Sequence, residues 1–204
     1  DSHVGTFTAA CAVHIYRGDA LPAEYRGDAF ACDPTANLVH RDHLMPIGPT
    51  FASRMANSGR EFLASPDNWF RPVFLATGPD GALYVCDMYR KTIEHPDYLP
   101  VEARKRTDFT TGRDLGRIWR VTRNEFEPQN ARSKFPAAAS TAQLVQALGD
   151  PNALWRETAQ RLLVERKDPK ALPLLAKDVK FSEAELKRRI DILLLKGWSG
   201  LPVE

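Results

Sequence analysis

The sequence lacks the short motifs that mark common metal, haem and nucleotide sites. Its three cysteines, Cys11, Cys32 and Cys86, form neither a C-x-x-C pair nor the C-x-x-C-H motif of covalent haem. The G-x-x-x-x-G-K-[ST], G-x-G-x-x-G, H-E-x-x-H and G-x-S-x-G motifs are also missing. We therefore expect no haem in this chain, and the sequence predicts no metal ligands.

Neither sign of charge is in excess, and long apolar runs are missing. Lys and Arg number 28 against 26 Asp and Glu, a formal net charge of +2. This excludes the strong basic surplus of a general nucleic-acid binder. No apolar run approaches the roughly 18 residues of a membrane-spanning helix, so no transmembrane segment is expected. The first residues lack both Met and a signal-peptide pattern, so we expect a mature product or a piece of a longer protein.

The character of the 204-residue sequence changes near residue 123. Residues 1–122 alternate short apolar runs with Gly, Pro, Asp and Asn, residues 123–139 are polar and read as a linker, and residues 140–204 have a helical period. Strands are predicted over 12–17, 29–33, 37–41, 72–77, 82–87 and 116–121. Short antiparallel strands joined by tight turns, such as the P-D-G turn at 79–81, indicate a sandwich, a barrel or a propeller.

The last part of the sequence predicts helices that follow one another in pairs. We expect helices over 141–148, with Ser140 as the N-cap, and over 153–166. A third helix is expected after residue 169, and a fourth is expected to open at Ser182. Helix pairs repeating at about 30 residues are typical of a solenoid.

Polar side chains gather where the strands of the P-D-G hairpin begin and end. Arg71 precedes the first strand, whereas Asp87, Tyr89 and Arg90 end or follow the second. Because a hairpin brings these ends together, we expect the four residues to lie close to one another. Arginines can grip carboxylates, and His95 has a pKa suited to a general base. The alternative is a structural ion pair at Asp87 and a surface loop around His95.

Two further groups are candidates. His40 and Arg41 lie on the earlier hairpin and could join the polar side chains at the ends of the P-D-G hairpin strands, on one rim of the fold. Cys11 and Cys32 both lie in strand-like surroundings, where they could form a disulfide that closes a loop of about twenty residues, or remain buried thiols. Their spacing does not decide between these two states.

The chain resembles one family through a series of motifs. These are T-x-A-C-x-x-x-I-Y-R-G-D (8–19), F-A-C-D-P-T-A-N-L-V-H-R (30–41), R-E-F-L-A-S-P-D-N-W-F-R-P-V (60–73), T-G-P-D-G-A-L-Y-V-C-D-M-Y-R (77–90), I-E-H-P (93–96), G-R-I-W-R-V (116–121) and D-P-N-A-L-W-R-E-T-A-Q-R-L-L (150–163). The series resembles the planctomycete- and verrucomicrobial-type membrane-bound dehydrogenases, large secreted proteins described as haem-binding. Their distant relatives are the soluble glucose and sorbosone dehydrogenases.

The resemblance implies a fold and a cofactor. The chain would hold the last blades of a β-propeller, mainly antiparallel β, followed by HEAT-like helices, as a fragment of a larger protein. Relatives use pyrroloquinoline quinone (PQQ) with calcium. His95, Arg71 and Asp87 would then be catalytic, and Arg71, Tyr89, Arg90, His40 and Arg41 would bind the cofactor.

The resemblance also implies a function and a compartment. The protein would be a periplasmic or secreted quinoprotein-type dehydrogenase of sugars, aldehydes or alcohols, with electron transfer to a fused cytochrome c domain. The remaining blades or a complementing chain would be its partners. An oxidising compartment favours the Cys11–Cys32 disulfide and leaves Cys86 free. The alternative hypothesis is a non-catalytic propeller module that binds carbohydrate or a protein partner.

Overall fold

The computed structural model describes residues 7–127 and 139–177, and the chain divides into two compact units. The first unit spans residues 1–78 and 82–126, and the second spans 79–81 and 127–204. The first is built of β-sheet and the second of α-helix. The helix predicted to open at Ser182 and most of the predicted linker lie outside the described residues.

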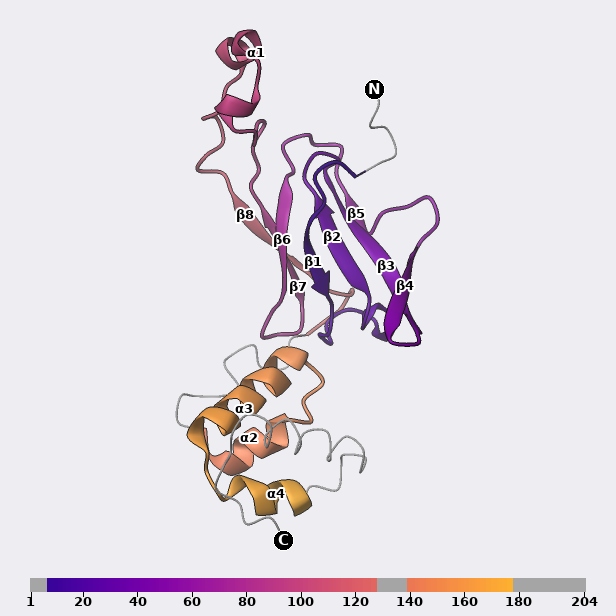
Figure 1. Ribbon diagram of the computed structural model, residues 1–204, viewed down its shortest axis with the longest axis vertical. Coiled ribbons are helices and arrows are strands. Elements are labelled where there is room, and N and C mark those ends of the chain that lie inside the picture. Colours follow the sequence, from indigo (N-terminus) through magenta and orange to yellow (C-terminus); the bar gives the residue numbers. More distant parts are fainter. Residues whose placement is uncertain (1–6, 128–138, 178–204) are drawn as a thin grey trace. The chain divides into compact units, whose positions relative to one another are not determined.

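The first sheet of the β unit is antiparallel, in the order β1-β2-β3-β4, with β5 also paired to β3 (Figure 1). Its strands are β1 (Cys11–Ile15), β2 (Ala29–Asp33), β3 (Leu38–Ile47), β4 (Thr50–Met55) and β5 (Leu63–Ala64). The prediction for β2 is confirmed. The predicted strand 37–41 is too short, because β3 continues for six residues and forms a hairpin with the unpredicted β4. Beyond Asp42, β3 has only β4 as a partner, which leaves room for Pro46 in the strand.

The second sheet is formed by β6 (Pro72–Thr77), β7 (Leu83–Asp87) and β8 (Arg117–Val121), antiparallel and in that order. The predicted P-D-G hairpin is confirmed, and Gly81 has the positive φ of 80° that the turn was expected to need. Between β7 and β8 the chain makes a long excursion over residues 88–116. This excursion carries a 3₁₀ turn, Pro96–Tyr98, and the short helix α1, Val101–Arg106 (Figure 1).

The core of the β unit lies between the two sheets. Strand β6 contacts both β1 and β2, and one face of each sheet supplies the buried side chains. These residues are Tyr16, Leu21, Phe30, Cys32, Val39, Leu75, Leu83 and Val85. The fold is therefore two packed, mostly antiparallel sheets that resemble neighbouring blades. The described residues close no barrel or ring.

The helical unit contains α2 (Thr141–Ala147), α3 (Ala153–Arg166) and α4 (Ala171–Lys177). Ser140 caps α2 as predicted, in a capping box with Gln143. The three helices share an apolar core that includes Leu144, Ala159 and Leu163. The described residues of this unit form three helices, and three helices do not establish a HEAT-like repeat. No helix among the described residues is both long and apolar enough to cross a bilayer.

Candidate functional site

Asp87, the last residue of β7, is the centre of the predicted rim, and only 2% of it is exposed. Its Oδ1 accepts the backbone N–H groups of Arg71 and Tyr89, both at 2.8 Å. Its Oδ2 accepts the indole Nε1–H of Trp119 at 3.0 Å. The structure therefore brings Arg71 and Tyr89 together at Asp87, as the hairpin argument predicted. Because both carboxylate oxygens are engaged by the protein, the geometry gives Asp87 a bracing role.

The guanidinium of Arg71 is turned toward backbone carbonyls rather than toward a free space. Its Nε donates to the carbonyl of Arg90 at 3.1 Å, Nη1 to that of Pro34 at 2.6 Å and Nη2 to that of Lys91 at 3.0 Å. Burial lowers the pKa of Arg71. Arg71 thus ties the β2–β3 turn to the segment after β7, and each of its three guanidinium nitrogens donates one hydrogen bond to the backbone.

Arg90 also donates a hydrogen bond to a backbone carbonyl. Its Nη2 donates to the carbonyl of Phe109 at 2.8 Å, and its buried Nε has no partner among the described residues. A quinone with three carboxylates needs guanidinium groups that are free to form bidentate pairs. Arg71, whose Nε, Nη1 and Nη2 all donate to backbone carbonyls, does not offer such a group in this arrangement and does not fit the predicted role of binding PQQ. The role of Arg90 in binding PQQ stays a prediction.

His95 lies apart from this group, in the excursion between β7 and β8. It caps the 3₁₀ turn, where its Nδ1 accepts the backbone N–H of Asp97 at 3.3 Å and its ring lies 5.7 Å from that of Tyr98. Its side chain is 63% exposed. None of its contacts reaches Arg71 or Asp87, so the structure does not bring together the three residues predicted to be catalytic.

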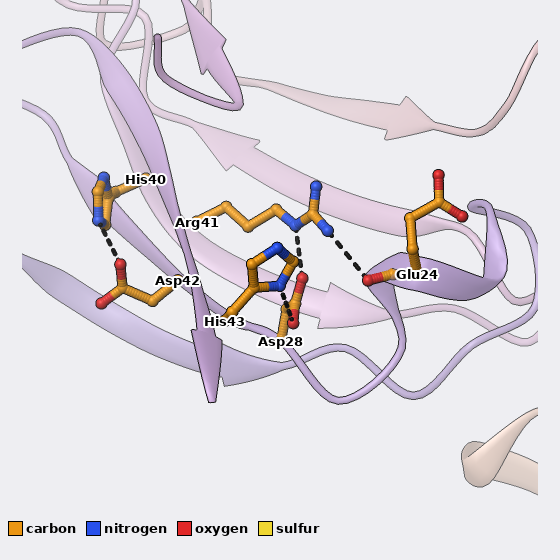
Figure 2. Close-up of polar contacts among 6 residues, drawn as sticks. All are labelled: Glu24, Asp28, His40, Arg41, Asp42 and His43. Carbon is orange, nitrogen blue, oxygen red and sulfur yellow. Dashed lines mark hydrogen bonds and ion pairs between the residues drawn. The ribbon is translucent and has the colours of Figure 1, made fainter. Parts of the chain in front are cut away.

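His40 and Arg41 are neighbours on β3, and their side chains therefore project from opposite faces of the sheet. His40 contacts two carboxylates, Glu61 at 2.7 Å through Nδ1 and Asp42 at 3.0 Å through Nε2. Figure 2 shows His40 beside Asp42, away from the cluster that holds Arg41. The two side chains consequently lie on different faces of the first sheet, and their predicted role in binding a cofactor stays a prediction.

Arg41 belongs to a buried ionic cluster that the sequence did not predict (Figure 2). Its Nε donates to Asp28 at 2.6 Å, its Nη2 donates to the carbonyl of Glu24 at 3.0 Å, and its guanidinium stacks 3.6 Å from the ring of Tyr25. His43 Nδ1 lies 2.9 Å from the other oxygen of Asp28. The sequence signal is an alternation of Arg41 and His43 on one face of β3, opposite Asp28, which is recognisable only once the strand register is known.

The three cysteines are free thiols in the structure. The predicted Cys11–Cys32 disulfide is therefore not present, although the register of β1 and β2 places the two residues opposite each other. Cys11 Sγ instead donates to the carbonyl of Val73 at 3.7 Å. Burial raises the pKa of Cys32 to about 12, with smaller contributions from Cys11 and Cys86. Disulfide formation remains a prediction that the register permits.

An exposed group of aromatic and charged side chains adjoins Asp87, and Tyr89 is the member of it that was predicted from the sequence as a site residue. We call it the aromatic strip; it consists of Asp67, Trp69, Tyr89, Arg117 and Trp119. The Arg117 guanidinium stacks 3.5 Å above the Tyr89 ring and lies 5.5 Å from the Trp119 ring. The rings of Trp69 and Tyr89 are 5.7 Å apart.

Asp67 supplies the negative charge of the aromatic strip. It accepts the hydroxyl of Tyr89 at 2.9 Å and the backbone N–H of Trp69 at 3.0 Å. These two hydrogen bonds, with Trp69 the larger cause, lower the pKa of Asp67, whereas the bond to Asp67 raises the pKa of Tyr89. The signal in the sequence is the placement of Trp69 and Tyr89 just outside the ends of the hairpin strands.

No group of three or more His, Cys, Asp or Glu side chains in the described part of the chain is placed to hold a metal ion. The residues described here therefore offer no carboxylate cluster that fits calcium.

Comparison with known proteins gives one match. A family model described as a domain of unknown function, DUF7133, matches residues 1–125. The chain belongs to the DUF7133 family. No curated protein and no solved structure matches it. The matched segment contains the whole candidate site, including the aromatic strip.

Proposed function

We propose that this chain forms the scaffold and the substrate-binding side of a periplasmic quinoprotein-type dehydrogenase, which oxidises sugars, aldehydes or alcohols and passes electrons to a cytochrome c. The motif series between residues 8 and 163 supports the redox class. The observation that carries the assignment of a scaffold role is that Arg71 and Asp87 are hydrogen-bonded to other groups of the protein. Residues occupied in this way hold a rim in place and leave the chemistry to other groups.

The proposed fold of the whole protein is a β-propeller followed by HEAT-like repeats. Two antiparallel sheets that pack face to face support the first part, since blades of a propeller pack in this way. Three short helices that share one core support the second part. The remaining blades, or a complementing chain that supplies them, are the partners that this proposal requires.

The proposal assigns no quinone contact and no calcium ligand to the described residues. The guanidinium of Arg71 does not fit the carboxylates of PQQ, that of Arg90 donates to the carbonyl of Phe109, and Arg41 is committed to Asp28. If the protein uses PQQ and calcium, other residues hold them. What the described residues contribute is the positioning of the rim and of the substrate.

The test is dye reduction by the purified protein together with the blades or chain that complement it, after addition of PQQ and calcium, with sugars, aldehydes and alcohols as substrates. The proposal predicts reduction that requires both quinone and substrate, followed by reduction of added cytochrome c. It also predicts that His95→Gln leaves turnover unchanged, because His95 has no contact with Arg71 or Asp87. A folded protein that reduces neither acceptor with any substrate would contradict the proposal.

A second candidate function is a non-catalytic module that binds carbohydrate. The observation that favours it is the exposed aromatic surface beside Asp87, where Arg117 stacks on the ring of Tyr89. Saturable binding of an oligosaccharide, without reduction of either acceptor, would support this function over the dehydrogenase.

A further inference from the structure

We infer that the aromatic strip is a binding site for a neutral pyranose sugar. The inference rests on the carbohydrate chemistry that both proposed functions share, and it assigns that chemistry to Asp67, Trp69, Tyr89, Arg117 and Trp119. These five side chains include one carboxylate, one guanidinium and three aromatic rings. They come from the segments just before β6 and just after β7 and from β8, so the site is assembled by the second sheet.

The strip offers the apolar faces that a sugar ring needs. Trp119 is 43% exposed, and Trp69 and Tyr89 are half-buried, so each keeps part of its ring accessible. A pyranose has one face of C–H groups, which packs well on an aromatic ring and excludes water from it. Ligand sites typically combine such apolar walls with a few placed polar groups.

The two charged side chains complement the hydroxyl groups of a sugar. A hydroxyl can donate to the carboxylate of Asp67 and accept from the guanidinium of Arg117. Tyr89 holds both groups, since its hydroxyl binds Asp67 and its ring lies beneath Arg117. No carboxylate in the described part of the chain lies within ion-pair distance of Arg117. Its N–H groups are therefore not committed to an acid within the protein.

The charges also indicate that the ligand is neutral. An acidic ligand that approached Arg117 would meet the carboxylate of Asp67, whose lowered pKa keeps it ionised at neutral pH. A cationic ligand would find the face of Tyr89 already covered by Arg117. A neutral polyol satisfies both groups at once.

The strip is held rigid before any ligand arrives. Asp87 fixes the backbone of Tyr89 and the indole of Trp119 with one carboxylate. Tyr89 has a positive φ of 46°. Residues other than glycine rarely adopt this backbone conformation, and such residues cluster at functional sites. Gly112 also has a positive φ, 88°, and a Cβ there would lie 3.0 Å from the ring of Trp69. Glycine at this position lets the backbone of the excursion pack closely against the indole of Trp69.

The test is titration of the 204-residue chain with cellopentaose, maltopentaose and a pentamer of galacturonic acid, followed by tryptophan fluorescence and calorimetry. We expect saturable binding of at least one of the two neutral pentaoses and weaker binding of the acidic pentamer. Arg117→Ala should weaken the neutral binding about tenfold, since a hydrogen bond from a charged group contributes about that much. Trp69→Ala should weaken it at least as much.

Matched controls use side chains of the same types away from the strip. Arg113→Ala and Tyr98→Ala remove exposed residues and should leave the dissociation constant unchanged. Because Arg117 is exposed, its alanine variant tests the site even if Trp69→Ala fails to fold.

Three outcomes would overturn the inference: no saturable binding of either neutral pentaose, tighter binding of the acidic pentamer, or equal losses in Arg117→Ala and Arg113→Ala. Dye reduction without neutral pentaose binding would remove this site and leave the dehydrogenase standing. Binding without dye reduction would support the site and remove the dehydrogenase.

Discussion

At the scale of single residues, Asp87 shows how a strand-end carboxylate can serve the fold. Three N–H groups, from Arg71 just before β6, from Tyr89 at the start of the excursion and from Trp119 in β8, converge on its two oxygens. A buried acceptor with three donors cannot be replaced by a group of another polarity without leaving donors unpaired. Asp87 is therefore a positioning residue for Tyr89 and Trp119 in the aromatic strip.

The first prediction concerns this brace. Asp87→Asn places an NH₂ group where a carboxylate oxygen now accepts an N–H, so at least one donor loses its partner. We expect the free energy of unfolding to fall by about 2–4 kcal/mol, measured by urea denaturation. Asp114→Asn, at a side chain that is 85% exposed, should change it by less than about 0.5 kcal/mol. Equal stabilities of the two variants would refute the bracing role.

The second prediction concerns pH and His14, whose ring lies 2.8 Å from the hydroxyl of Thr77. Burial, and secondarily Arg17, lower the pKa of His14 in the folded state. Between the lowered pKa of folded His14 and its ordinary value in the unfolded chain, the folded state binds fewer protons than the unfolded state. Stability therefore rises with pH over that range. Unfolding midpoints should fall as the pH drops below the ordinary histidine value of about 6.5, and the dependence should flatten in His14→Gln. An unchanged slope in that variant would show that other groups cause it.

The sequence could place residues near one another at this scale, but it could not orient them. The hairpin topology alone predicted Arg71 beside Asp87, and the structure confirms it. The direction of the Arg71 guanidinium depends on the carbonyls of Pro34 and Lys91, which only the tertiary fold brings within reach. His95 follows Arg90 closely in the sequence, which suggested the same rim, whereas in the fold it contacts Asp97 and Tyr98 within the excursion after β7.

At the scale of elements, local signals predicted what local interactions determine. The N-cap at Ser140 and the P-D-G turn specify their own geometry, and both were predicted. Strand β4 was not predicted; it pairs with the part of β3 that continues past Pro46, where β3 has a partner on one side only. The aromatic strip was missed because its members are distant in sequence and meet only when β8 pairs with β7.

The third prediction concerns the pairing of β1 with β2, which places Cys11 opposite Cys32. Oxidised glutathione should convert the two thiols into a disulfide and release two molecules of reduced glutathione. The reaction should be slow at neutral pH, because burial raises the pKa of Cys32 to about 12. Closing this loop should stabilise the fold by about 3 kcal/mol.

Alkylation followed by mass measurement reads out the reaction. After oxidation, one alkyl group should remain and should map to Cys86. Cys86→Ser should still form the bond, and Cys32→Ser should not. Three alkylated cysteines after prolonged oxidation would mean that the register does not permit the bond.

At the scale of the whole molecule, each sheet of the β unit buries one of its faces against the other sheet and leaves its second face exposed. In the second sheet the open face carries a row of register partners, Phe74, Cys86 and Ile118. Phe74 is 57% and Ile118 68% exposed. Exposed apolar rows and free strand edges indicate that another surface covers them. The sequence predicted the sheets, but the choice of covered face follows from packing between residues far apart in the chain.

The fourth prediction tests this open face. Light scattering of the purified chain should show an assembly larger than one chain, and Ile118→Glu should shift it toward the monomer without loss of folding. Arg113→Glu, at another exposed position, should leave the assembly size unchanged. A wild-type chain that stays monomeric at high concentration would contradict the prediction that this face has a partner.

The central claim is that the end of the β6–β7 hairpin is a braced surface that binds a sugar. Two-dimensional NMR of the tryptophan indole N–H groups tests it most directly, because Trp69 and Trp119 belong to the strip and Trp155 lies in α3. On titration with cellopentaose or maltopentaose, the resonances of Trp69 and Trp119 should shift along saturable curves while that of Trp155 stays in place. Unmoved strip resonances with both pentaoses would contradict the account.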